Sequence, residues 1–108
     1  MGVESLKSWK QLGELATKTA TTHLNQTAAT PSRFTTMSLR VNKLLVDFSK
    51  QRVTDEVVTS LISLAKEASL EPAIENLFQG VQVNPTEGRA ALHMALRAPP
   101  DMWPKNVA

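Results

Sequence analysis

The chain has 108 residues, which suffices for one small domain, and no cysteine, which excludes a disulfide framework and a thiolate nucleophile. Its formal net charge is +2, its basic residues are interspersed with acids, and aromatic residues make up only 5%, a composition that argues against nucleic-acid binding. No apolar run approaches the roughly 20 residues that span a bilayer, and the start lacks the apolar core of a secretory signal, so a cytoplasmic protein is expected.

The first 30 residues predict one helix and then a threonine-rich stretch. Apolar residues recur at helical spacing from Ser5 to about Ala20: Leu6, Trp9, Leu12, Leu15 and Ala16. We expect Trp9 to anchor a core, since no neighbouring residues suggest a ligand cage. The run from Thr17 to Thr30 has poor helical propensity. His23 lies in this run without visible ligand partners, so it is expected to be exposed or locally hydrogen-bonded.

A β-hairpin is predicted after a short helical turn from Pro31 to Phe34. Apolar and polar residues alternate from Met37 to Val41 and again from Leu44 to Ser49. Asn42 and Lys43 would form the connecting turn, where asparagine tolerates a left-handed conformation. A lone hairpin is marginally stable in water, so it needs a surface to pack on. That surface would be the neighbouring helices or a further part of a larger protein.

Two helices are predicted next. The first begins at Asp55 with Thr54 as its N-cap, and acids in its first turn suit the helix dipole. Its apolar face is broad: Val57, Val58, Leu61, Ile62, Leu64, Ala65 and Ala68. The second has Pro72 in its first position and ends at Gly80 in a left-handed conformation. Its buried side is formed by Ile74, Leu77 and Phe78.

The stretch from Val83 to Arg97 is predicted to be the helix around which the chain is organised. Asn84 is a favourable N-cap, Pro85 suits the first helical position, and Glu87 can complete a capping box. A narrow apolar stripe follows at helical spacing: Ala91, Leu92, Ala95 and Leu96. These features predict a packed helix and do not by themselves indicate a reaction.

Residues 98–108 are predicted to form an irregular arm. Three prolines exclude a continued helix: Pro99, Pro100 and Pro104. Trp103 in this arm is expected to be exposed unless a partner covers it.

Two sets of side chains are candidates for chemistry. Arg89 and His93 are four residues apart on the predicted helix, and a histidine one turn from an arginine could act as a base. The alternative, that Glu87, Arg89, His93 and Arg97 fix how the helix packs, is favoured because no nucleophile or phosphate cradle accompanies the pair. Asp47, Asp55 and Glu56 could act as paired acids, but strand polarity and helix-end charges explain them better. The two histidines, seventy positions apart, do not have metal-ligand spacing.

Four stretches, in one order, resemble the glucose-6-phosphate isomerase family. Pro31, Arg33 and Phe34 match its P-x-R-F element, and LLVDFSKQRVTDEVV looks like its L-L-x-D-[YF]-S-K-x-x-[IV]-T-x-E stretch. Phe78-Gln79-Gly80 is similar to its M-F-x-G-x-x-I-N lead-in. NPTEGRAALHMALR resembles its N-x-T-E-G-R-A-x-L-H-x-A-L-R segment. An ordered set of motifs is far more specific than a lone short motif.

The resemblance implies a mainly α fold with one small β-hairpin, a single N-terminal helical segment over residues 1–108. It would belong to a larger α/β protein, a three-layer sandwich whose sugar-phosphate-binding domains lie outside this stretch. Family members interconvert glucose 6-phosphate and fructose 6-phosphate in glycolysis and gluconeogenesis, as cytoplasmic homodimers without metal or organic cofactor.

The family's catalytic glutamate, histidine and lysine, and its phosphate-holding loops, come from segments downstream of the matched region. The resemblance therefore implies no catalytic, substrate-binding or metal-binding residue among residues 1–108. We expect the chain alone to be inactive. A rival interpretation is a non-enzymatic helical interaction module, derived by truncation, that binds a partner through exposed apolar faces.

Overall fold

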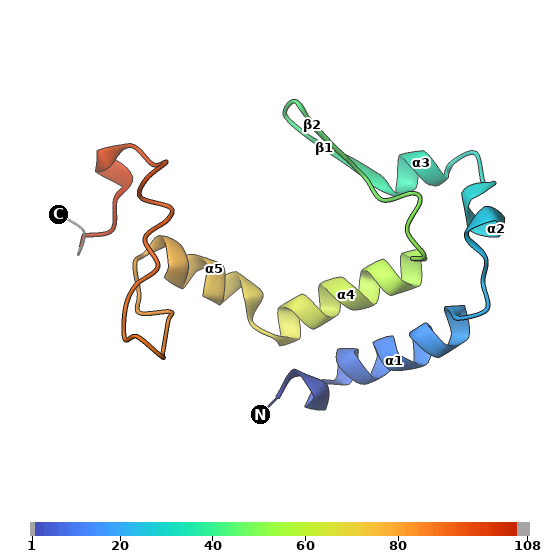
Figure 1. The fold of residues 1–108 in the computed structure, drawn as a ribbon, viewed down its shortest axis with the longest axis horizontal. Coiled ribbons are helices and arrows are strands. Elements are labelled where there is room, and N and C mark those ends of the chain that lie inside the picture. Colours follow the sequence, from blue (N-terminus) through green and yellow to red (C-terminus); the bar gives the residue numbers. More distant parts are fainter. Residues whose placement is uncertain (1, 106–108) are drawn as a thin grey trace. The chain divides into compact units, whose positions relative to one another are not determined.

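The computed structural model describes residues 2–105, and the chain divides into two units, Met1–Ser63 and Leu64–Ala108. Helices provide most of the regular structure of both units (Figure 1). Among the described residues the only sheet is a two-stranded antiparallel hairpin, in the first unit. The predicted fold class, mainly α with one small hairpin, is therefore confirmed.

The first unit holds a 3-10 turn, three helices, the hairpin and most of a fourth helix. These are η1 (Val3–Ser5), α1 (Lys7–Thr19), α2 (Leu24–Ala28), α3 (Arg33–Thr36), β1 (Ser38–Val41), β2 (Leu44–Asp47) and α4 (Asp55–Glu67). The second unit holds the end of α4, then α5 (Leu70–Phe78) and a 3-10 turn, η2 (Pro100–Met102).

Helix α1 forms where it was predicted, but the prediction that Trp9 anchors a core is wrong. The buried positions of α1 are Ser8 and Leu15, which lie seven residues apart and so share one face. Trp9 follows Ser8 directly, about 100° further around the helix, and 47% of its surface is exposed.

The short helix α2 was not predicted, because it lies in the threonine-rich run. Thr27 donates its hydroxyl to the carbonyl oxygen of Leu24 at 3.0 Å, within the helix itself. The hydroxyl is satisfied by the helix in this way and does not compete for other backbone groups. His23 directly precedes α2 in an extended conformation, and its side chain is exposed, as expected.

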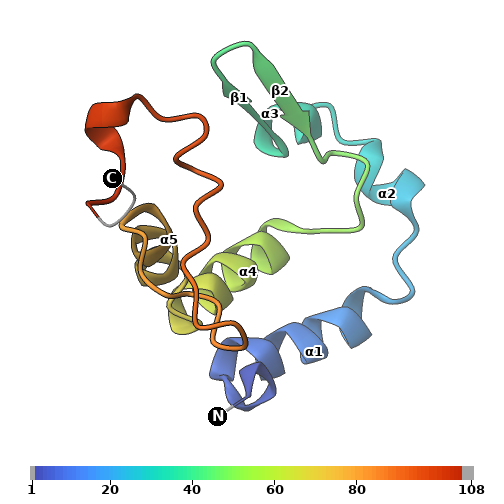
Figure 2. The ribbon, with the colours of Figure 1, turned by 60° about the vertical axis from the view of Figure 1, so that its left-hand side comes forward.

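The hairpin has the predicted register and turn. Ser38 pairs with Asp47 and Val41 with Leu44, and Asn42 in the turn has φ 54°. Both strands are largely exposed, so the neighbouring helices of the described chain do not cover them. Figures 1 and 2 show the hairpin extending beyond α3 at its base.

Helix α4 begins as predicted, since the Thr54 hydroxyl oxygen accepts a 3.3 Å hydrogen bond from the Val57 amide. Helix α5 begins two residues earlier than predicted, so Pro72 is its third residue, although Gly80 after it has the expected positive φ of 68°. The predicted buried side of α5 is wrong, because Ile74 and Phe78 are exposed. No other described helix or strand packs extensively against α5.

The predicted helix from Val83 to Arg97 does not form. Asn84 accepts hydrogen bonds from the Thr86 and Glu87 amides, at 3.2 and 3.4 Å, but these close an isolated turn. Gly88 there has φ 61°, and the Asn84 amide donates to the Arg89 carbonyl in an isolated bridge. A left-handed residue ends helical geometry, and a short helix without a buried face does not offset its nucleation cost.

The apolar stripe of that predicted helix is accordingly dispersed. Ala95 is buried, but Leu96 is 87% exposed, and residues 93–97 form turns. The arm that follows is irregular, as predicted, apart from the single 3-10 turn η2, whose first residue is Pro100. Trp103 is exposed, as predicted, and its Nε1 donates to the Ala98 carbonyl at 2.9 Å. The arm's last three residues, 106–108, lie outside the described part of the chain.

Candidate functional site

The two residues predicted to share a helix edge, Arg89 and His93, do not do so. Arg89 closes the bridge with Asn84, and His93 lies in the following turns, with both side chains exposed. Five surface hollows are described in residues 2–105, and neither residue lines any of them. The arrangement that would have allowed acid–base chemistry by this pair is therefore not assembled in the structure.

Asp47, Asp55 and Glu56 lie where a structural role predicts them, at a strand end and in the first turn of a helix. Asp47 ends β2, while Asp55 and Glu56 occupy the first turn of α4. Glu56 lies 3.8 Å from the Lys18 ammonium, and both side chains are largely exposed. An exposed ion pair of this kind contributes little stability, typically below about 1 kcal/mol.

Arg33, at the start of α3, makes three hydrogen bonds to the loop between β2 and α4. Its Nε donates to the Ser49 carbonyl oxygen at 2.6 Å. Its Nη2 donates to the carbonyl oxygens of Gln51 and Val53, at 2.9 Å each. We call these three bonds the Arg33 clamp. Arg33 is 8% exposed, and a charge that is removed from water to this degree requires such partners.

Ser49, the first residue held by the clamp, is also held from the other side. Its amide donates to Asp47 Oδ1 at 2.8 Å, while its carbonyl oxygen accepts from Arg33. Hydrogen bonds from the Ser49 side chain and backbone lower the pKa of Asp47 below its ordinary value of 3.8. Asp47 and Arg33 thus fix the backbone direction of the loop between β2 and α4.

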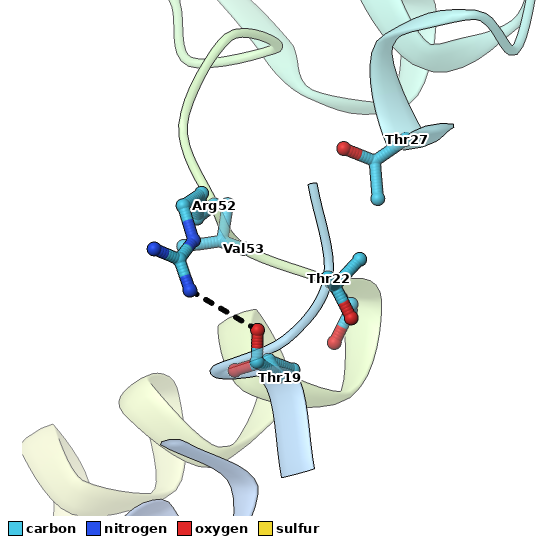
Figure 3. A pocket seen from close by; sticks show the side chains of 6 residues that line it. Thr19, Thr22, Thr27, Arg52 and Val53 are labelled. Atoms are coloured by element: carbon cyan, nitrogen blue, oxygen red, sulfur yellow. Dashed lines mark hydrogen bonds between the residues drawn. The ribbon is translucent and has the colours of Figure 1, made fainter. Parts of the chain in front are cut away.

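A second arginine, Arg52, lies in this loop and joins it to the end of α1. Arg52 Nη2 donates to the carbonyl oxygens of Thr19, at 3.2 Å, and Ala20, at 2.9 Å. The last carbonyls of a helix lack helical partners and carry its partial negative charge, so a guanidinium is favourable there. Figure 3 shows Arg52 directed at Thr19, across the opening between α1 and the loop.

The hollow beside Arg52 is too small for a substrate. It is lined by Thr19, Thr22, Thr27, Arg52, Val53 and Thr54. Its volume for a water-sized sphere is about 10 Å³, which is room for roughly one water molecule. A sugar phosphate cannot enter a space of this size.

Arg33 and Arg52 both recognise backbone. Both arginines donate to main-chain carbonyls, so their guanidinium groups hold a loop in place. Residues 2–105 contain no group of three or more histidine, cysteine, aspartate or glutamate side chains arranged for a metal ion. No helix in that range is long and apolar enough to cross a membrane.

Sequence reasoning included Arg33 in a family motif but assigned it no contact, and it did not single out Arg52. The signal for Arg33 was its fixed place between Pro31 and Phe34, within a stretch of few charges. For Arg52 the sequence contains no comparable signal, because its acceptors are backbone carbonyls that any residue provides.

Comparison with known proteins connects this loop to one family. The phosphoglucose isomerase family profile matches residues 47–104, which begins at the Asp47–Ser49 contact. The glucose-6-phosphate isomerase of Shewanella amazonensis is 45% identical over 100 residues, which are 92% of this chain. That of Methylococcus capsulatus is 44% identical over 93 residues, 85% of this chain, and the cytosolic enzyme of Arabidopsis thaliana is 38% identical over 95 residues, 88% of this chain.

The chain spans less than a fifth of these relatives, 17% of the Methylococcus and Arabidopsis proteins and 18% of the Shewanella protein. The match to the family profile still extends over more than half of the chain. The resemblance inferred from four ordered motifs is confirmed, and the chain belongs to the phosphoglucose isomerase family.

Proposed function

We propose that this chain is the N-terminal segment of a glucose-6-phosphate isomerase and that it serves there as a scaffold. The observation that carries the proposal is the Arg33 clamp. It joins two of the family-like motifs, the one containing Arg33 and the one containing Ser49, through backbone hydrogen bonds. The motif residues therefore act on the chain's own loop, which is what a structural segment requires.

The complete protein would interconvert glucose 6-phosphate and fructose 6-phosphate, in glycolysis and gluconeogenesis, without metal or organic cofactor. This reaction needs a base within hydrogen-bond reach of the substrate's carbon-bound proton, and a sugar phosphate held in near-attack geometry. The exposed positions of Arg89 and His93, both outside any helix, support assigning both tasks to other segments. The isolated 108 residues are then inactive.

The complete protein would be a larger α/β sandwich, a homodimer in the cytoplasm. The name of the cytosolic Arabidopsis relative supports this location. The chain covers only 17–18% of the length of the three relatives named above. This small share supports a much larger parent fold.

A chimera tests the proposal. The matched 100-residue stretch of the Shewanella relative is replaced by this chain, and conversion of fructose 6-phosphate to glucose 6-phosphate is followed with a coupled dehydrogenase. We expect a folded, active isomerase. Arg33→Ala should lower its melting temperature and leave KM unchanged, because the clamp positions a loop and does not touch substrate. A chimera that folds but does not turn over would contradict the proposal.

A second candidate function, a non-enzymatic interaction module, is favoured by one observation, the exposure of many large apolar side chains, Trp103 among them. Light scattering after size exclusion, with and without a full-length isomerase, separates the two. A stable complex with the intact enzyme would support this candidate. Strictly monomeric behaviour and no complex would count against it.

A further inference from the structure

The hairpin has one wholly apolar face, which follows from its register. In an antiparallel pair, directly opposite residues project to the same face, and successive pairs alternate between faces. Leu39 pairs with Val46, and Val41 pairs with Leu44, so these four residues form what we call the apolar hairpin face. Ser38 with Asp47 and Arg40 with Leu45 form the polar hairpin face.

The apolar hairpin face is open to solvent. The exposed fractions are 47% for Leu39, 54% for Val41, 63% for Leu44 and 40% for Val46. Helix α3 is the element packed near β1, and it leaves these side chains uncovered. A two-stranded sheet without a covering layer is marginally stable in water. The face is therefore built to be covered by apolar surface from outside the first unit.

Two occupants differ in the interface area that they need: a second copy of this chain, and a further part of a longer isomerase polypeptide. Stable association of separate chains buries about 1,600 Å² in total, far more than two faces of four side chains provide. A segment of the same polypeptide needs much less area, because a covalent connection holds it at high effective concentration. The chain covers only 18% of its Shewanella relative, so such polypeptide exists in the relatives in ample length.

We propose that the apolar hairpin face docks on the remaining polypeptide of the isomerase, with the polar hairpin face directed to solvent. This inference rests on the proposed function. The apolar hairpin face is then the surface by which the segment is joined to the rest of the protein, and the polar hairpin face is left free.

Cysteine labelling tests the docking, since the chain contains no cysteine of its own. Val41→Cys places a thiol on the apolar hairpin face, and Arg40→Cys, the matched control, places one on the polar face at the adjacent residue. Each variant is made in the full 108-residue chain and in the Shewanella chimera. Iodoacetamide modification of the peptide containing residue 40 or 41 is followed by mass spectrometry, which separates it from other cysteines of the chimera.

In the isolated chain, we expect both thiols to react at similar rates at all protein concentrations. In the chimera, Val41→Cys should react at least about tenfold more slowly than Arg40→Cys, because its labelling then requires local opening. If Val41→Cys prevents folding, Leu39→Cys reports on the same face.

Three outcomes would overturn the inference. Equal labelling of both thiols in a folded, active chimera would overturn it and leave the proposed function intact. Protection of Val41→Cys in the isolated chain that grows with concentration would assign the face to a second copy. A chimera that does not fold would overturn the proposed function and this inference with it.

Discussion

The Arg33 Nε–H donates a 2.6 Å hydrogen bond to the Ser49 carbonyl oxygen, across sixteen positions of the sequence. This bond and the two from Nη2 hold the loop that connects the hairpin to α4. Asp47 completes the arrangement by accepting from the Ser49 amide. The family-like motifs of this region are thus joined by contacts that orient backbone.

Removing the clamp should open the loop. Arg33→Ala leaves the buried Ser49 carbonyl without its partner, which costs about 1–3 kcal/mol and speeds local opening by roughly 5- to 150-fold. The measurement is hydrogen exchange of the Ser49 amide by NMR. Arg40→Ala removes the same charge from the exposed hairpin and should leave that rate unchanged. Equal rates in both variants would show that the clamp contributes no stability.

The Asp47 contact should make the loop sensitive to acid. Hydrogen bonds from Ser49 lower the pKa of Asp47 in the folded chain below 3.8, so the carboxylate's contribution is present above that value. It is lost as the pH falls through the lower, folded-state pKa. NMR titration of the Asp47 carboxyl should give a midpoint below 3.8, with the Ser49 amide shift following it. Asp47→Asn should abolish the pH dependence of that amide, and a midpoint above 3.8 would contradict the contact.

The hairpin and α4 could be predicted because their signals are local. Thr54 caps α4 within one turn, and the hairpin follows from alternation on either side of Asn42. The contacts of Arg33 and Arg52 could not be predicted, since their acceptors are backbone carbonyls 16 to 33 positions away. Every residue has a backbone carbonyl, so the sequence does not show which carbonyls accept these hydrogen bonds.

The prediction of a helix at 83–97 was wrong because the same sequence signals are compatible with either a helix or an isolated turn. Asparagine followed by proline begins a helix, but an Asn84 side chain that bonds the Thr86 amide also closes an isolated turn. The apolar stripe favours a helix only where a partner surface buries it, and Leu96 is 87% exposed. The apolar face of α5 is exposed for the same reason: periodicity predicts which residues share a face, but it does not show whether another surface buries that face.

Two glycine substitutions test the turn that replaces the predicted helix. An added Cβ meets nothing within 4 Å at either Gly13 or Gly88, so space does not distinguish them. Gly13→Ala in α1 should stabilise the chain by about 0.5–1 kcal/mol. Gly88→Ala should destabilise it by about 1–2 kcal/mol, because Gly88 has φ 61°. Circular dichroism of the Shewanella chimera in increasing urea measures both. A rise in helicity in Gly88→Ala would instead indicate that residues 83–97 favour a helix.

The isolated chain should unfold with little cooperativity. Among residues 2–105, the buried hydrophobic residues are Leu15, Met37 and Ala95, two of them in the first unit and one in the second. This small buried core only weakly offsets the conformational entropy that is lost when the helices become ordered. A thermal melt followed by circular dichroism at 222 nm should be broad and begin at low temperature. A sharp, cooperative transition would contradict this expectation.

The measurement that tests the scaffold role most directly is an assay of the purified 108-residue chain alone. Conversion of fructose 6-phosphate to glucose 6-phosphate is followed with a coupled dehydrogenase, beside His93→Ala. We expect no turnover above background in either protein, because Arg89 and His93 line none of the hollows described and do not share a helix edge. Turnover above background that disappears in His93→Ala would contradict it.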